Sequence, residues 1–542
     1  MCGIWAYLSL KKNKLDAVKL FQDFYNLKHR GPDNSFFETY NNVLIGFHRL
    51  AIMNDTFTSN QPFIYEDELR TIVFMCNGEI YNYKELAEFY NLDVKNDCMI
   101  LPEIYYSLCK SDNESDFNRV IREEVKGEFS FLLFEFDRLK NVKRVIAARD
   151  EIGIRPLYYY PDYDRLFFTS ELKGGLSFEG ELREFPPGTI ITYDMDELGH
   201  MKVDMDDFSR VYETISHSID PLDNIRNSVM NSIRRRLNAD KPFAFLLSGG
   251  VDSSLVAAIS SKILGKPIRT FCCGMTEGTD LKYARMVAKH IGSTHTEVMF
   301  TEEEGLAAID DVIRTVESWD TTTIRASVGQ YLVSKYIGTK TDCKVVMVGE
   351  GPDEVCSSYL FNWYAPDGNA LDMESRYYVK NIHHYDVKRA DRCISRWGLE
   401  GRVPLLDPEF IEAYWKILPE WRMPTHKNME KWWLREAFNK TGLLPDDVLW
   451  RKKEAFSDGV SGEKSWYKII QDWIETKVTD EEFAASTYGT KTKEAYYYRK
   501  VFCEIFGESR QRVIPGYWQP KWSADGEVKE YIDPSARILD VY

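Results

Sequence analysis

The chain has 542 residues and a mass of 63.2 kDa, which predicts two to four domains at about 100–200 residues per domain. Hydrophobic residues make up 44% and charged residues 28%, which is typical of a globular protein and excludes disordered and fibrous classes. Asp and Glu number 85 against 69 Lys and Arg, a net charge of -16. This acidity argues against a protein that coats nucleic acid or an anionic membrane, although a local phosphate pocket stays compatible with it.

No apolar run reaches the roughly 18–20 residues that span a bilayer. The N-terminus has no basic stretch before its short apolar segment, so it does not resemble a secretory signal. The ten cysteines show no C-x-x-C pair, a usage typical of reduced thiols. We therefore expect a cytoplasmic protein with neither a membrane nor a nucleic-acid partner.

The first part of the chain is rich in β-branched and aromatic runs bounded by turn residues, with a few helical patterns between them. The expected strands are residues 42–47, 71–76, 128–136 and 165–169, and the expected helices are 15–28 and 99–110. This mixture predicts stacked antiparallel sheets with flanking helices, an α+β sandwich over residues 2–195.

Residues 196–222 are polar and acidic, which is typical of a connector between domains. Strands and helices then alternate. The expected strands are 243–247, 268–273, 296–300 and 344–348, and the expected helices are 254–264, 281–291, 303–316 and 328–337. This order predicts a doubly wound, mostly parallel α/β sheet in a domain over 223–513 whose C-terminal part is helical. Scattered Pro and Gly predict a loosely packed tail over 514–542.

Cys2 is a candidate nucleophile because of its position. Removal of Met1 would leave a free α-amine, which titrates near about 7.7–8.0, on the same residue as the thiol. The amine can then accept the thiol proton. The alternative is that Cys2 is only a small residue at the start of a strand.

Asn77 and Gly78 follow an apolar strand and are, on one interpretation, an ordinary turn. On the other, the Asn77 side-chain amide and the Gly78 backbone N–H stabilise an oxyanion. Arg49 offers a planar fork for a carboxylate, and Glu79 and Asp97 offer anions for an ammonium group. These groups together suit an α-amino acid with an acyl side chain.

The sequence resembles the class II glutamine amidotransferases in four ordered motifs: Cys2-Gly3-Ile4, HRGPD at 29–33, HRL at 48–50 and NGEIYN at 77–82. The resemblance implies an N-terminal nucleophile fold in which the cysteine attacks the glutamine side-chain amide, forms a thioester and releases ammonia. The resemblance implies that Cys2 is the nucleophile and that Asn77 and Gly78 stabilise the oxyanion. Glutamine would be bound by Arg49, Asn77, Gly78, Glu79 and Asp97. Residues 95–99 (KNDCM) depart from the family pattern but keep the aspartate.

The segment 248–254 (SGGVDSS) follows a short strand and opens a helix. Glycines let backbone N–H groups approach an anion, and a helix N-terminus favours negative charge. Asp252 within it would repel a phosphate unless a cation intervened, which indicates Mg²⁺ on a nucleotide. The Walker pattern is absent. The alternative is an ordinary strand-to-helix turn.

The same segment resembles the signature of the ATP pyrophosphatases, which cleave ATP between the α and β phosphates. A second strand end, 348–354 (VGEGPDE), supports the resemblance. It offers Asp353 as a second Mg²⁺ carboxylate and Glu350 as a group that acts on the substrate. An acidic surface turn is the alternative.

Both halves together resemble glutamine-dependent asparagine synthetases over about residues 2–510, with further matching stretches at 320–327, 389–392, 401–407 and 451–460. The resemblance implies that the aspartate side chain attacks the α-phosphorus of ATP to give β-aspartyl-AMP and pyrophosphate. Ammonia from the first site then displaces AMP through the protein interior. The implied substrates are aspartate, glutamine and ATP, with Mg²⁺, and a homodimer is left open.

By position in the family motifs, the ATP-binding residues are Leu247, Ser248, Gly249, Gly250, Asp252, Ser253, Ser254, Cys273, Val348, Gly349 and Lys453. Lys453 would neutralise the leaving pyrophosphate, and Glu350 would serve the intermediate's chemistry. Val348 and Pro352 stand where the family has serines, and residues 391–392 read Asp-Arg in place of Asn-Lys. These departures put ligand affinity in question.

Three rival functions are compatible with parts of the sequence. A related ATP-dependent amide former, such as a β-lactam synthetase, generally lacks the N-terminal cysteine, which is present here. A non-catalytic sensor of glutamine or ATP would not need Glu350, Asp353 and Asp252. A phosphosugar amidotransferase shares only the first half and has no SGGVDSS loop.

Overall fold

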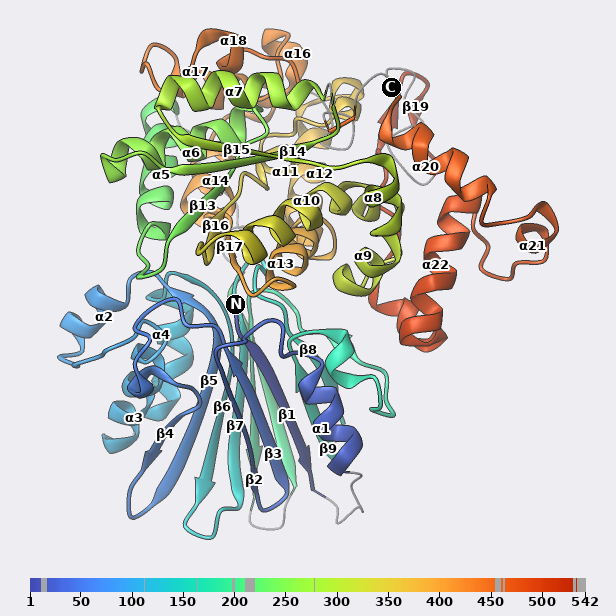
Figure 1. Ribbon diagram of the computed structural model, residues 1–542. Helices are drawn as coiled ribbons and strands as arrows, with labels where there is room; N and C mark the ends of the chain where they lie inside the picture. The colour runs from blue at the N-terminus through green and yellow to red at the C-terminus, as the bar shows by residue number, and fades with distance from the viewer. Residues whose placement is uncertain are drawn as a thin grey trace. The chain divides into compact units, whose positions relative to one another are not determined.

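The computed structural model describes the whole chain except residues 11–16, 112, 163, 197–199, 210–219, 277, 454–459, 462–463, 530–532 and 534–542. It divides into two compact units, Met1–Arg210 with Asn238–Lys241, and Val211–Leu237 with Pro242–Tyr542 (Figure 1). Within the described ranges, no helix is long and apolar enough to cross a membrane.

The first unit is built on two six-stranded antiparallel sheets, which confirms the expected sandwich. One has the order β10-β8-β9-β1-β3-β2: Arg183–Glu184, Tyr158–Pro161, Arg165–Thr169, Gly3–Ser9, Val43–Arg49 and Asn34–Tyr40. The other has the order β12-β11-β7-β6-β5-β4: Met201–Asp207, Thr189–Met195, Val142–Arg149, Gly127–Asp137, Arg70–Ile80 and Phe63–Glu66. All strand pairs in both sheets are antiparallel.

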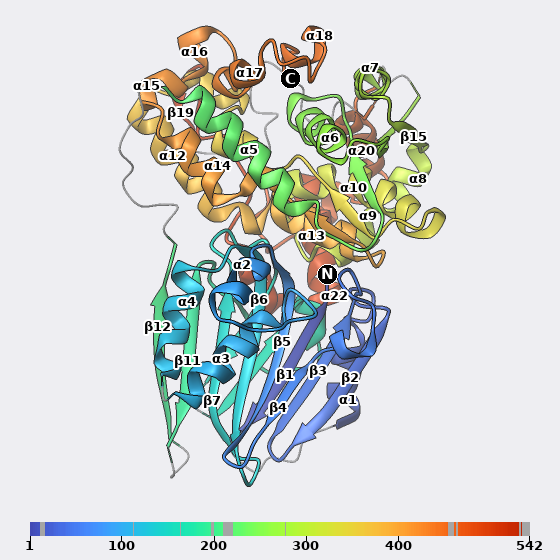
Figure 2. The same ribbon diagram turned by 90° about the vertical axis from the view of Figure 1, so that its left-hand side faces the viewer.

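Helices cover this unit on its outer faces. They are α1 (Ala17–Tyr25), α2 (Tyr83–Phe89), α3 (Ile100–Lys110) and α4 (Phe117–Glu123). Ile104 and Phe117 of α3 and α4 pack against Phe74 and Phe131 of β5 and β6, and all four side chains are fully buried. Figures 1 and 2 both show α3 and α4 beside the second sheet. The apolar contact holds the long strand β5, which carries three of the predicted site residues, Asn77, Gly78 and Glu79.

The segment expected to connect the domains differs in its first part. Residues 201–207 form β12, an edge strand paired along its length with β11. Its side chains are mostly exposed, with Val203 and Met205 alternating with acidic residues. Backbone pairing with β11 needs no apolar side chain at an edge, so the polar composition concealed the strand. Residues 210–219 of the expected connector lie outside the described residues.

The second unit contains a five-stranded, wholly parallel sheet with the order β15-β14-β13-β16-β17. The strands are Thr294–Met299, Arg269–Gly274, Phe243–Leu246, Val345–Met347 and Glu400–Arg402. Helices lie on both sides of it (Figure 1), which confirms the doubly wound fold. They include α5 (Leu222–Arg236), α6 (Val251–Leu264), α7 (Thr279–Ile291), α8 (Glu302–Ala307), α9 (Ile309–Val316) and α10 (Thr321–Lys340).

The remainder of this unit is helical, as expected. The helices are α11 (Pro352–Val355), α12 (Gly368–Asn381), α13 (Asp386–Ser395), α14 (Pro408–Trp415), α15 (Pro419–Arg422), α16 (Pro424–Lys427), α17 (Trp432–Phe438), α18 (Asp446–Leu449), α20 (Trp466–Glu475), α21 (Asp480–Ala484) and α22 (Lys493–Phe506). A short hairpin follows, formed by β18 (Trp522–Ser523) and β19 (Gly526–Glu527).

The described part of the tail is packed, so the prediction of a loose tail is wrong for residues 514–522. Trp518 and Trp522 are buried in one cluster with Phe361 and Tyr378. The Trp518 backbone N–H donates to Asp320 Oδ1 at 2.7 Å, at the N-terminus of α10. Large aromatic side chains gain enough from burial to order a Pro- and Gly-containing segment.

Candidate active sites

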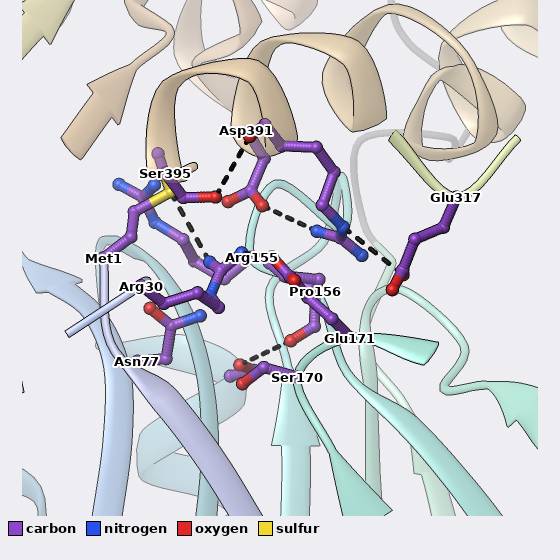
Figure 3. Close-up of polar contacts among 12 residues, drawn as sticks. Met1, Arg30, Asn77, Arg155, Pro156, Ser170, Glu171, Glu317, Asp391 and Ser395 are labelled. Carbon is purple, nitrogen blue, oxygen red and sulfur yellow. Dashed lines mark hydrogen bonds and ion pairs between the residues drawn. The ribbon is translucent and has the colours of Figure 1, made fainter. Parts of the chain in front are cut away.

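Cys2 lies directly before β1, where the first sheet meets the end of β5 from the second. Its backbone nitrogen donates to Asn77 Oδ1 at 2.8 Å, and Arg30 Nε donates to its carbonyl at 2.8 Å. The thiol is almost wholly buried and points toward the Leu50 carbonyl at 3.9 Å. Figure 3 shows Met1, Arg30 and Asn77 gathered at this corner. Cys2 and the predicted oxyanion donor Asn77 are therefore in direct contact.

Asn77 is oriented by that contact. Because its Oδ1 accepts from Cys2, its Nδ2 faces elsewhere, and this fully buried nitrogen has no hydrogen-bond partner among the described residues. A buried amide donor without a partner is rare, and it is ready to bind an oxygen that arrives with a substrate.

The interpretation of Asn77 and Gly78 as a turn is wrong, because both lie inside β5 and pair with Ser130 and Phe129 of β6. A Cβ on Gly78 would stand 2.3 Å from the Glu128 carbonyl oxygen. The glycine therefore serves close strand-to-strand approach. The Asn-Gly pair, common in hairpin turns, here marks a crowded site in a strand.

Arg49 ends β3, and its guanidinium is fixed by a loop. Its Nη1 donates to Asn60 Oδ1 at 2.7 Å, and its Nη2 donates to the Met53 carbonyl at 3.1 Å and to Asn54. Burial lowers the pKa of Arg49 from its ordinary value. The Arg49 guanidinium is thus held in one orientation by neutral oxygen acceptors, which do not neutralise its positive charge.

Glu79 and Asp97, the predicted ammonium ligands, are both buried. Asp97 Oδ2 accepts from the Ile80 backbone N–H at 2.9 Å and from the Cys98 thiol at 3.4 Å, which ties it to the end of β5. The Cys76 thiol contact, followed by burial, raises the pKa of Cys98, so Cys98 stays a protonated donor. The two acidic side chains, Glu79 and Asp97, therefore both lie at the buried end of β5.

The second site is a cavity of about 180 Å³ in the other unit, at the carboxyl ends of β13, β14 and β16. Ligands of open parallel sheets bind at such edges. Most of the predicted ATP residues line it: Leu247, Ser248, Gly250, Asp252, Ser253, Cys273, Gly349 and Lys453, with Glu350 and Asp353. Three of them do not, namely Gly249, Ser254 and Val348.

Gly249 has a backbone role. Its φ is +76°, and a Cβ would stand 2.4 Å from Tyr283 Cβ, so only glycine fits this turn between β13 and α6. Ser248 Oγ and Ser253 Oγ lie 3.0 Å apart across the turn. Ser254 Oγ is buried and has no partner within the described ranges. The turn presents hydroxyls at the N-terminus of the 14-residue helix α6.

Two lysines face the predicted metal carboxylates. Lys431 Nζ lies 2.5 Å from both Asp252 Oδ2 and Asp353 Oδ1, and Lys453 Nζ lies 2.9 Å from Asp353 Oδ1. Burial alone would raise the pKa of Asp353, but Lys431 and Lys453 outweigh it and hold that pKa well below its ordinary value. Burial dominates at Asp252 and raises its pKa.

No motif in the sequence indicated Lys431 as a site residue. It precedes α17 in a left-handed backbone conformation, φ +56°, and it is buried. It is far from Asp252 along the chain and belongs to no motif, so no local signal links the two. Its ammonium group is nevertheless the closest cation to both carboxylates in the described residues.

Glu350 belongs to a polar chain across the cavity. Gln330 Nε2 donates to Glu350 Oε1 at 2.9 Å, Arg389 Nη1 donates to Gln330 Oε1 at 2.8 Å, and Arg389 pairs with Asp386 at 3.0 Å. Burial raises the pKa of Glu350. Gln330 and Asp386 were also missed, because they lie on helices α10 and α13 without a local motif.

The structure shows the surroundings of three residues that depart from the family pattern. Pro352 is the first residue of α11, where its missing N–H costs nothing. Val348 is buried at the end of β16. Arg392 pairs with Asp391 at 2.6 Å and with the buried Glu317 at 3.6 Å, so its positive charge is balanced inside the unit.

Comparison with known proteins places both units in one family. Residues 1–185 match the glutamine amidotransferase domain, and residues 224–374 and 364–530 match asparagine synthase. Asparagine synthetase (glutamine-hydrolyzing) of Gallus gallus is 37% identical over 586 aligned positions, covering 100% of this chain and 99% of the relative. The Homo sapiens enzyme of the same name is 36% identical over 591 positions with the same coverage. The chain therefore belongs to the glutamine-hydrolysing asparagine synthetases.

Proposed function

We propose that this asparagine synthetase divides its reaction between the two sites described above, with glutamine hydrolysed at Cys2 and aspartate activated by ATP in the cavity of the second unit. The observation that carries the first half is the contact of Cys2 with Asn77, whose buried Nδ2 has no partner in the described part of the chain.

At the first site, the chain would begin at Cys2 once Met1 is removed. The α-amine accepts the thiol proton, and the thiolate attacks the side-chain amide carbon of glutamine. Asn77 Nδ2 and the Gly78 N–H donate to the oxyanion. The C–N bond then breaks, ammonia leaves with a proton from the α-ammonium, and water hydrolyses the thioester to glutamate. Arg49 would hold the substrate carboxylate, and Glu79 and Asp97 its ammonium group.

At the second site, Leu247, Cys273, Val348 and Gly349 would contact the adenosine part of ATP. The turn of Ser248, Gly249, Gly250, Ser253 and Ser254 would bind its phosphates with the N-terminus of α6. The aspartate side-chain carboxylate attacks the α-phosphorus, and pyrophosphate leaves beside Lys453. Ammonia then attacks the acyl carbon of β-aspartyl-AMP, AMP leaves, and asparagine is formed. Glu350 would act on the reacting centre of this intermediate.

Asp252 and Asp353 are the residues that would hold Mg²⁺. The donor set suits a hard cation, because carboxylate oxygens are its preferred protein ligands. Asp252 Oδ1 is buried and has no partner within the described ranges, which leaves one oxygen for an incoming ligand. When bound with ATP, the ion would neutralise charge on the phosphates.

Incubation with ATP, aspartate and glutamine labelled with ¹⁵N at its side-chain amide tests this division. We expect labelled asparagine, AMP and pyrophosphate by mass spectrometry. ADP in place of AMP would contradict attack at the α-phosphorus. Intact-mass measurement should show a chain that begins at Cys2, and fully active protein that retains Met1 would contradict the α-amine as base.

Two further proposals concern the location of the protein in the cell and its oligomeric state. All ten cysteines are free thiols, which supports a reducing, cytoplasmic location. A homodimer also stays a proposal, and analytical ultracentrifugation of the whole chain tests it.

A further inference from the structure

Arg30 is the link between Cys2 and a buried charge cluster. Its Nε donates to the Cys2 carbonyl at 2.8 Å, its Nη1 donates to Glu171 Oε1 at 2.5 Å, and its Nη2 lies 3.6 Å from Met1 Sδ. Its side chain is fully buried. A planar guanidinium with two of its edges bound cannot rotate, so the carboxylate on Nη1 fixes the direction of Nε.

Glu171 is the centre of that cluster. Besides Arg30, Lys173 Nζ lies 2.6 Å from its Oε2, and His29 Nε2 lies 3.1 Å from the same oxygen. Glu171 is fully buried. Burial would raise the pKa of Glu171, but Lys173, His29 and Arg30 outweigh it and hold the pKa well below its ordinary value. Burial lowers the pKa of His29, so at neutral pH the one carboxylate faces two permanent cations.

The segment that carries Glu171 is itself fixed to β1. Ile4 N donates to Ser170 Oγ at 2.9 Å, and Ser170 N donates to the Ile4 carbonyl at 2.9 Å. Figure 3 shows Ser170 and Glu171 below and beside Arg30 at this corner. The start of the chain is therefore held from two directions, by the Ser170 backbone and by the Glu171 carboxylate through Arg30.

We propose that Glu171 is a positioning residue for the glutaminase reaction: through Arg30 it fixes the carbonyl of Cys2, and thus the thiol and the α-amine, beside the oxyanion donors. The proposal rests on the proposed role of Cys2. Glu171 does not touch the substrate, and it acts on the geometry and the charge around the nucleophile. Lys173 balances the carboxylate and holds it from the other side.

The carboxylate also sets the local charge. Its removal leaves Arg30 and Lys173 uncompensated near the start of the chain. Uncompensated positive charge disfavours the α-ammonium and favours the thiolate, so both pKa values of Cys2 should fall. A merely structural defect would not move these two titrations in the same direction.

The test compares Glu171→Gln with wild type in the full-length enzyme. We expect kcat for glutamate release to fall by up to about 100-fold with little change in KM, because a small displacement of a nucleophile is costly while glutamine keeps its own ligands. Ammonia-dependent asparagine formation should be unchanged. Alkylation of Cys2 by iodoacetamide, followed by peptide mass spectrometry, should show its pH midpoint shifted to lower pH.

Glu171→Asp, which keeps the charge at a shorter reach, should restore the alkylation midpoint and part of kcat. Glu135→Gln is the matched control, since it breaks the Arg70–Glu135 pair of the same unit, at 3.1 Å, without contact to Cys2. An unchanged kcat or an unchanged midpoint in folded Glu171→Gln would overturn the proposal, as would an equal loss of ammonia-dependent activity. If Cys2→Ala retains glutamine hydrolysis, the role of Cys2 fails instead, which separates the two claims.

Discussion

The two sites are built in different ways. At the first, Cys2 precedes β1 of one sheet, and Asn77 and Gly78 lie in β5 of the other. The strand register within each sheet and the hydrogen bond from Cys2 to Asn77 bring them together. At the second, Asp252 and Asp353 follow separate parallel strands and are joined by lysines from the helical region. A site held by strand register tolerates little change of shape, whereas a site held by charge balance can exchange one cation for another.

The first prediction is the largest effect and tests whether the sites are separable. Cys2→Ala should reduce glutamine-dependent asparagine formation to background, because Cys2 is the proposed nucleophile of the glutaminase site, and should leave the ammonia-dependent reaction intact. Assays with glutamine and with ammonium chloride in parallel provide the measurement. Equal loss of both would mean that the two sites are not independent.

The second prediction concerns Glu350, which lines the cavity of the second unit. Glu350→Ala should slow aspartate-dependent exchange of labelled pyrophosphate into ATP by about 10³-fold, within the range for removal of a group acting in the transition state. ATP affinity should change much less. Normal exchange in this variant would exclude Glu350 from formation of the intermediate, and glutaminase activity serves as the internal control.

The third prediction concerns Lys431, which sharpens the comparison because it joins the two carboxylates of the second site. Lys431→Met should lower ammonia-dependent synthesis by about 100-fold, because two half-buried carboxylates lose the cation between them at a site where electrostatics dominate. Glutamine hydrolysis should not change. Lys427→Met, an exposed lysine on α16, is the control. The measurement is steady-state kinetics of both variants at saturating Mg²⁺. Full activity of Lys431→Met would show that a bound metal alone can balance both carboxylates.

The smallest effect on catalysis is expected at Trp518. Trp518→Ala should lower the free energy of unfolding of the second unit by about 3 kcal/mol, at the low end for a buried aromatic residue. Synthesis at 25 °C should change less than in Lys431→Met. Thermal denaturation gives the measurement, and an unchanged transition would show that the aromatic cluster contributes nothing to the fold.

The difference between the sites also explains what the sequence could predict. The residues of the first site lie in short contiguous motifs, and strand patterns located β5, β6 and β9 to within a few residues. Lys431 and Gln330 could not be found, because their roles depend on tertiary contacts between residues far apart in the chain. In the sequence, Lys431 looks like an ordinary residue before a helix and Gln330 like an ordinary helical residue. The polar edge strand β12 was missed since edge strands do not need an apolar pattern.

The packed tail has a consequence for how the chain folds during its synthesis. The first unit needs only residues up to Lys241, whereas the aromatic cluster of the second closes only when Trp518 has left the ribosome. At about 5–20 residues per second, Phe361 and Tyr378 stay uncovered for on the order of ten seconds before Trp518 follows them. Molecular chaperones would meet an aromatic surface in this interval, and truncated chains that end before Trp518 would keep that surface permanently.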